Sequence, residues 1–174
     1  DGEPRCHLAG VPRSAEQPPY PHYIIQDENS VAILYEYVHE PRIIPLDGSA
    51  HPKNYRAWDG DSRGHWEGDT LVIDVSNFNG RSWLDMAGNF VDENLHVVER
   101  YTFKDGDHYI YEATLTDPTV FSEPWKIRFE VRRQPESAPS RRGPRAATRS
   151  SRPHTPRRTA RLPPRARTCP TTRP

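Results

Sequence analysis

Residues that could transfer protons concentrate between positions 39 and 65 of this chain. His39, Asp61 and His65 are the candidates there, and Glu99 is a fourth from a later segment. The pKa of a histidine lies near neutral pH and a neighbouring carboxylate can orient its ring, so such a set suits acid–base chemistry. Convergence of three or more of these groups in a concave pocket would favour an enzyme.

Glu99 is the most informative of the four because of its place in an alternating pattern. It shares one face of the segment 95–103 with apolar residues, whereas Arg100 points to the other face. A carboxylate on a buried face is desolvated, so it needs a partner or a raised pKa. We favour a structural role, either an ion pair with an arginine such as Arg42 or a position at the sheet edge, and a general acid or base inside the fold is the alternative.

A second group of residues could bind a ligand. Its members are Arg42, His51, Trp58, Trp83 and Asp85. Trp58 and Trp83 lie in loop-like segments and could stack on a sugar or an aromatic ligand. The other two tryptophans, Trp66 and Trp125, lie in expected strands and are assigned to the core.

Metal and cofactor motifs are missing from the sequence. His39, His51 and His65 are separated by 12 and 14 positions, and Asp59-Gly60-Asp61 lacks the pattern of a complete calcium loop. A nucleophile elbow, a P-loop and a dinucleotide fingerprint are also missing. We therefore predict no metal site, and no motif requires a cofactor.

Short strands must position these side chains. Apolar and polar residues alternate with period two, which is typical of strands with one buried face. Strands are expected over 23–26, 30–38, 42–46, 65–66, 70–75, 95–103, 108–115 and 125–131. Gly68 supplies the positive φ of a tight turn, and long loops are expected over 47–63 and 76–94.

About eight strands without a long helix predict an all-β fold, an antiparallel meander. We expect it to close into a small lipocalin-like barrel, with a β-sandwich as the alternative. Long loops gathered at one mouth would then form the ligand site.

Composition divides the chain into three parts. Residues 1–22 are rich in proline and predict an extended arm, and 23–133 predict the β-barrel domain. The tail, 134–174, holds eleven Arg and one Glu, a net charge of +10, so the residues before it carry −10. Without aromatic residues the tail is predicted to be disordered and is unlike segments that stack on nucleic-acid bases, so a nucleic-acid partner is not expected.

Other features limit the localisation and the partners. No apolar run approaches the roughly 20 residues of a membrane span. The start of the chain, Asp1-Gly2-Glu3-Pro4, lacks the basic and apolar regions of a signal peptide. Cys6 and Cys169 could form one disulfide, but we do not expect it because Cys169 lies in the tail. The oligomeric state is not readable from the sequence.

A series of short motifs resembles a family of secreted bacterial proteins, over roughly residues 6–131. The motifs are Tyr35-Glu36-Tyr37-Val38-His39-Glu40, Leu46-Asp47-Gly48, Gly64-His65-Trp66-Glu67-Gly68-Asp69-Thr70-Leu71-Val72-Ile73-Asp74, Phe78-Asn79, Trp83-Leu84-Asp85, Leu95-His96-Val97-Val98-Glu99-Arg100-Tyr101 and Pro124-Trp125. The resemblance implies export, and thus a secreted or periplasmic protein. It implies no particular reaction and no catalytic residue.

The chain departs from that family after about Arg133. Family members usually continue with another strand and a cysteine-containing end, whereas here the sequence becomes a run of Arg, Pro, Ala, Thr and Ser. A shifted reading frame of GC-rich DNA produces such a composition. We interpret the tail as a frameshift product or a cloning artefact.

Three functions stay open at this point. The first is a secreted β-barrel that binds a small amphipathic or carbohydrate-like ligand at its loop-lined mouth. The second is an extracellular enzyme that uses histidine and carboxylate chemistry on the same scaffold. The third is a structural or interaction module. An apolar cavity with few polar groups would favour the first function, and a filled interior the third.

Overall fold

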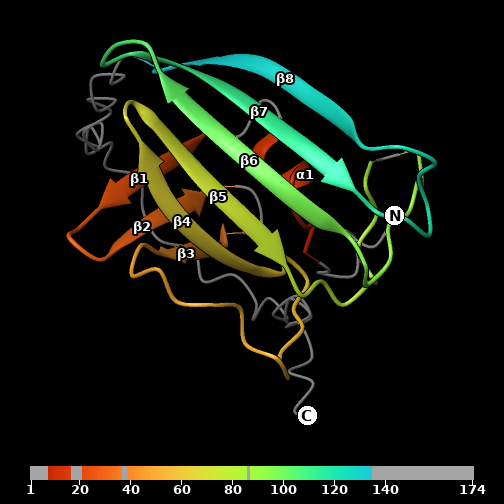
Figure 1. The fold of residues 1–174 in the computed structure, drawn as a ribbon. Helices are drawn as coiled ribbons and strands as arrows, with labels where there is room; N and C mark the ends of the chain where they lie inside the picture. Colours follow the sequence, from red (N-terminus) through yellow and green to blue (C-terminus); the bar gives the residue numbers. More distant parts are fainter. Residues whose placement is uncertain (1–7, 17–20, 37–38, 86, 135–174) are drawn as a thin grey trace, which may run out of the picture. The chain divides into compact units, whose positions relative to one another are not determined.

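The computed structural model describes residues 8–16, 21–36, 39–85 and 87–134. Its elements are α1 (Arg13–Glu16), β1 (His22–Gln26), β2 (Ser30–Tyr35), β3 (Pro41–Pro45), β4 (Asp61–Glu67), β5 (Thr70–Ser76), β6 (His96–Phe103), β7 (His108–Thr116) and β8 (Trp125–Arg132) (Figure 1). The all-β class is therefore confirmed. The expected tail, except Gln134, lies outside the described residues, as do Cys6 and Cys169.

The strands form two antiparallel sheets in which each strand pairs with its neighbour in the chain. The orders are β1-β2-β3 and β4-β5-β6-β7-β8, so the predicted meander is confirmed. The closed barrel is wrong, because no strand pairing among the described residues joins the two sheets. Pro41 and Pro45 offer a physical reason: they lie at the two ends of the edge strand β3 and cannot donate to a further strand.

One core lies between the two sheets, which makes the arrangement closer to the sandwich alternative. Val31, Ile33 and Ile44 of the small sheet join inward residues of the large sheet in a single buried cluster. Gly64 marks a close approach, since a Cβ there would lie 2.7 Å from Ile44 Cγ2 and 2.9 Å from Leu46 Cδ2. Larger side chains at that position would push the sheets apart.

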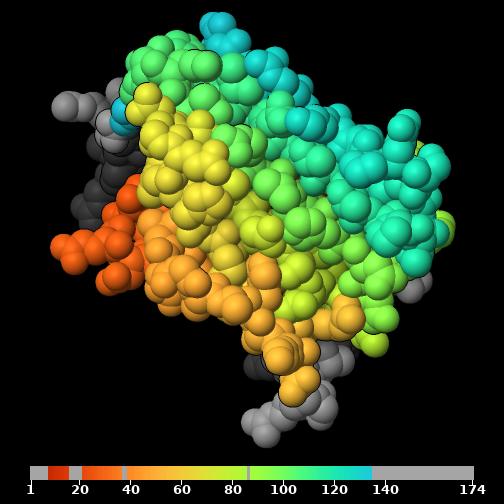
Figure 2. Space-filling model, viewed as in Figure 1, coloured from red at the N-terminus to blue at the C-terminus, as the bar shows by residue number. Residues whose placement is uncertain are grey.

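The opposite face of the five-stranded sheet is polar and is the face seen in Figure 2. Strand β8 shows the alternation: Lys126, Arg128 and Glu130 are exposed, and the intervening Ile127 and Phe129 are partly buried. This pattern is that of an antiparallel sheet with one face toward water.

Residues 8–16 correct the prediction of an extended N-terminal arm. Arg13–Glu16 form a short helix, and Ala9 and Val11 are 3% and 4% exposed. Val11 belongs to the core cluster. The prolines disfavour a long helix, but they do not prevent the segment from packing on the sheets.

Strand β4 begins four residues earlier than the sequence indicates. Ser62 and Gly64 point inward, and Asp61 and Arg63 point outward. Because the inward residues are small, the segment carries no apolar signal and its sequence predicts a loop. The expected turn at Gly68 is confirmed, with φ of 60°. No helix in the described part of the chain is long and apolar enough to cross a membrane.

Candidate functional site

A buried ion pair lies at the centre of the inner face. Arg42 Nη2 donates to Glu99 Oε2, and the two side chains are 5% and 0% exposed. Tyr111 donates to Glu99 Oε1 at 2.7 Å, and Arg42 Nε donates to Ser62 Oγ at 2.9 Å. The ion pair that we expected for Glu99 is therefore confirmed.

This cluster is enclosed in the core and has almost no contact with solvent. Burial, followed by the charge of Glu99, raises the pKa of Tyr101 and Tyr111, so both phenols keep their protons. The Glu99 carboxylate is held by the Arg42 cation and the Tyr111 hydroxyl. Its hydrogen-bonding capacity is largely used inside the protein.

The long loops meet at one end of the five-stranded sheet, as the sequence predicts. Register pairs Asp61 with Ser76 and His96 with Thr116, so the segments 47–60, 77–95 and 117–124 all leave from that end. A parallel bridge between Ala57 and Phe78 ties the first two segments together.

A pocket of about 370 Å³ lies at this loop end. It is lined by Leu84, Asp85, Asn89, Phe90, Val120, Phe121 and Trp125. The rings of Phe121 and Trp125 meet edge to face, with centroids 5.6 Å apart. Phe90 is 62% exposed, so one aromatic ring of the lining is open to solvent.

The polar side of the pocket is an Asp–Asn pair. Asn89 Nδ2 donates to Asp85 Oδ2 at 2.6 Å, and the backbone N–H of Ala87 donates to Oδ1 at 2.9 Å. The hydrogen bond from Asn89 lowers the pKa of Asp85, so its carboxylate is ionised at neutral pH. Asp85, a predicted ligand residue, is part of the pocket lining.

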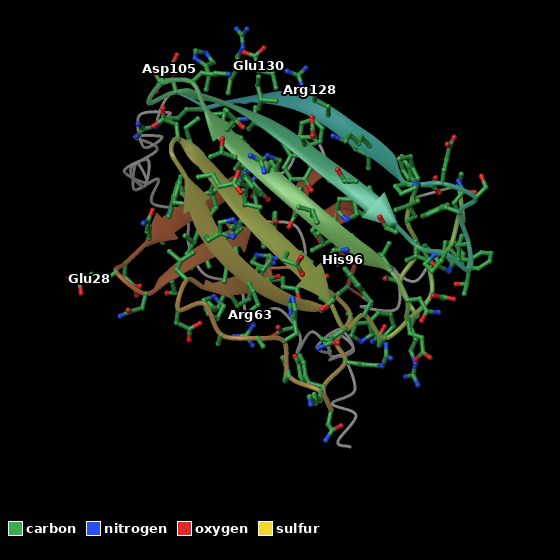
Figure 3. All side chains as sticks on the ribbon, viewed as in Figure 1. Glu28, Arg63, His96, Asp105, Arg128 and Glu130 are labelled. Atoms are coloured by element: carbon green, nitrogen blue, oxygen red, sulfur yellow. The ribbon has the colours of Figure 1, made fainter. Side chains whose placement is uncertain are left out.

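A chain of hydrogen bonds crosses the outer face beside the same loops. His51 Nδ1 lies 2.6 Å from Asp61 Oδ2, and its Nε2 lies 2.8 Å from Asp74 Oδ1. His96 Nε2 lies 2.8 Å from Asp74 Oδ2, and Arg63 Nε donates to Asp61 at 2.8 Å. Figure 3 shows Arg63 and His96 at this end of the sheet.

Within this chain of hydrogen bonds, the contact with Asp74 favours the protonated form of His96. His51 bridges Asp61 and Asp74 through its two ring nitrogens. The hydrogen bond that His96 donates to Asp74 raises the pKa of His96, and the same contact lowers the pKa of Asp74. The arrangement fixes the loop 47–60 to the sheet through His51.

A pair of carboxyl groups lies near the Arg42 guanidinium. Burial, and then a hydrogen bond to the Asp59 carboxyl, raises the pKa of Glu40 to about 9. A carboxyl group with a pKa of about 9 keeps its proton at neutral pH, so Glu40 is neutral there.

The four predicted catalytic residues do not converge. Glu99 is buried between the sheets, and His65 is exposed on the outer face, where it lies 3.2 Å from Glu67. The His39 side chain is exposed between β2 and β3, at a residue with φ of 56°. Asp61 instead contacts His51, and Glu99 contacts Arg42. In both cases a residue predicted to be catalytic pairs with a residue predicted to bind a ligand.

The two loop tryptophans lie outside the pocket lining. Trp58 is half-buried, and Trp83 is 39% exposed and forms an isolated bridge with Phe90. The Trp83 ring covers Gly88, where a Cβ would lie 3.8 Å from it. Trp83 thus supports the loop that carries Asp85.

Sequence reasoning missed several residues of these sites. Asp74 and His96 are outward residues of the neighbouring strands β5 and β6. The alternation of inward and outward residues along these strands could have indicated that both side chains lie on the outer face. Phe90 and Phe121 lie in segments without periodicity, and no signal marked them. Among the described residues, no three His, Cys, Asp or Glu side chains come together in a way that could hold a metal ion.

Comparisons with protein-family models, with curated proteins and with solved structures found no match for this chain.

Proposed function

We propose that this protein binds a small ligand with an apolar face and several hydroxyl groups, such as a sugar, in the pocket at the loop end. The observation that carries the proposal is one concavity that combines Phe90, Phe121 and Trp125 with the Asp85–Asn89 pair. Aromatic rings pack on the apolar face of a ring-shaped ligand. Carboxylate and amide oxygens accept hydrogen bonds from its hydroxyl groups.

The composition of the lining supports binding over catalysis. It is mostly apolar, with two polar side chains, and contains none of His39, Asp61, His65 and Glu99. A binding site needs only complementarity to its ligand, whereas acid–base catalysis needs proton-transfer groups within hydrogen-bond reach of the reacting atoms.

We propose in addition that the protein acts outside the cytoplasm. This proposal is supported by the resemblance of residues 6–131 to secreted bacterial proteins. A sugar-binding protein in that location would meet free carbohydrates or cell-surface glycans.

The test is to titrate the full chain with a panel of neutral monosaccharides and disaccharides. Binding is measured by calorimetry and by tryptophan fluorescence. Trp125 lines the pocket and should report binding. Phe90→Ala removes an exposed ring at little cost in stability, and we expect it to weaken binding about tenfold, near 1.4 kcal/mol. Tyr55→Ala is the matched control, because Tyr55 is 52% exposed and lies outside the lining.

Saturable binding that Phe90→Ala weakens and Tyr55→Ala leaves intact would support the pocket. An absence of binding across the panel, or an equal effect of the two variants, would contradict it.

A further inference from the structure

The outward face of the three-stranded sheet is apolar. Its residues alternate with the core residues of β1–β3 and are Tyr23, Ile25, Ser30, Ala32, Leu34, Pro41, Ile43 and Pro45. We call this set the apolar face. None of its residues is charged, and Tyr23, Ile25 and Ile43 are 69%, 56% and 57% exposed.

The contrast with the other sheet shows that the apolar face is unusual. The outward face of β4–β8 carries charged residues on every strand, among them Arg63, Asp74, Arg100, Glu112 and Arg128. Figure 3 shows Arg63, Arg128 and Glu130 on that side. A sheet face that stays in water is normally polar, and a contiguous apolar patch marks an interaction surface.

We propose that the apolar face binds the same face of a second copy of this chain, to form a two-fold symmetric dimer. In such a dimer each residue meets the same patch of its partner, so the patch must be complementary to itself. A pleated, uncharged surface meets this condition, and two sheets commonly pack face to face. Pro41 and Pro45 cannot donate to an added strand, which favours packing on the face over pairing at the β3 edge.

The area of the apolar face is that expected for the interface of a weak dimer. Its three most exposed side chains present on the order of 300 Å² of surface, and the whole face about 400–500 Å². Two copies would bury roughly 800–1,000 Å², at the low end of specific interfaces, where association is weak and reversible. This inference does not depend on the proposed sugar site.

Charged residues around the apolar face should make the strength of dimerisation depend on the salt concentration. Asp27 and Glu28 lie in the turn between β1 and β2, and Glu36 follows the other end of β2. Figure 3 shows Glu28 at the tip of its turn. Acidic residues of two copies repel each other, so added salt should strengthen the dimer. The same residues would repel an anionic lipid surface.

The test is sedimentation velocity of the full chain from low micromolar to near-millimolar concentration, at low and high salt. We expect reversible dimerisation that strengthens with salt. Ile43→Lys places two charges in the interface and should raise the dissociation constant at least tenfold. Ile110→Lys is the matched control, because Ile110 lies on the outward face of β7, paired with Glu130. Tyr23→Ser is a second variant for the same face.

Each outcome decides for or against the proposal. A wild-type chain that stays monomeric at all concentrations overturns it, as does equal dimerisation of Ile43→Lys and Ile110→Lys. Melting curves confirm that each variant is folded, and if Ile43→Lys unfolds, the result for Tyr23→Ser decides. Co-sedimentation of a monomer with neutral phosphatidylcholine vesicles would assign the face to lipid and also overturn the dimer.

Discussion

Substitution of Glu99 by glutamine should destabilise the fold far more than the change of one atom suggests. Glutamine has nearly the same volume and can still accept the hydrogen bond from Tyr111. It cannot neutralise Arg42, whose side chain is 5% exposed. Its amide group would also bring an N–H donor toward the guanidinium, which itself only donates.

The expected cost follows from the burial of the pair. Removing one partner of a buried ion pair costs about 3–5 kcal/mol, because the other charge stays buried without compensation. Whole domains are stable by about 5–15 kcal/mol. For a folded domain of this size, the melting temperature should fall by roughly 10–20 °C.

Urea unfolding of the full chain, followed by tryptophan fluorescence, measures this loss directly. The matched control is Glu67→Gln, since Glu67 is 50% exposed and pairs with Arg100 at 2.7 Å. Ion pairs in contact with solvent contribute little to stability, so Glu67→Gln should leave the urea midpoint nearly unchanged. An unchanged m value would show that both variants unfold from an equally compact state.

A double variant tests the cause. Arg42→Met combined with Glu99→Leu removes both charges of this buried pair, so it should be more stable than Glu99→Gln alone. The reasoning is refuted if Glu99→Gln costs less than about 1 kcal/mol, or if the double variant is less stable than the single one. Sugar binding should persist in folded Glu99→Gln, because Glu99 is not in the pocket lining.

Three further predictions concern the sheets and the loops. Gly64→Ala should cost about 1–3 kcal/mol by overpacking against Ile44, whereas Gly106→Ala, with open space around it, should be nearly neutral in the same urea assay. The pKa of Glu40, raised to about 9 by burial and the Asp59 carboxyl, means that the folded state holds a proton that the unfolded state releases. The contribution of Glu40 to stability should therefore be complete at low pH and fall as the pH rises from about 4.5 toward 9, and melting curves of Glu40→Gln should lack this component. His51→Ala should speed hydrogen exchange in residues 47–60, and unchanged protection would contradict its role as the link between loop and sheet.

The strands could be predicted from the sequence because period two is a local signal. Leu95–Phe103 and Trp125–Val131 alternate over their whole length, so their inward faces were evident. The same alternation indicated that Glu99 points inward, and the cost of an unpaired buried charge favoured a partner such as Arg42 over a general acid or base. Here local pattern and elementary electrostatics were sufficient.

Sheet closure and the pocket could not be predicted in this way. Whether a meander closes into a barrel depends on whether its two edge strands come close enough to pair. The alternation of residues within a strand carries no information about that distance. The pocket joins Phe90, Phe121 and Trp125 from three segments, which meet only through the register of the sheet. The contact between His51 and Asp74 likewise spans 23 positions and depends on a loop that has no periodicity.

The order of strands also has a consequence for synthesis of the chain. Arg42 precedes its partner Glu99 by 57 positions, so at about 5–20 residues per second it is made roughly 3–11 s earlier. During that interval the guanidinium remains hydrated and the inner face of β1–β3 has nothing to cover it. The hairpins of β4–β8 can form from neighbouring segments as they emerge, whereas the first sheet to be translated must wait for β6 before Arg42 can pair with Glu99.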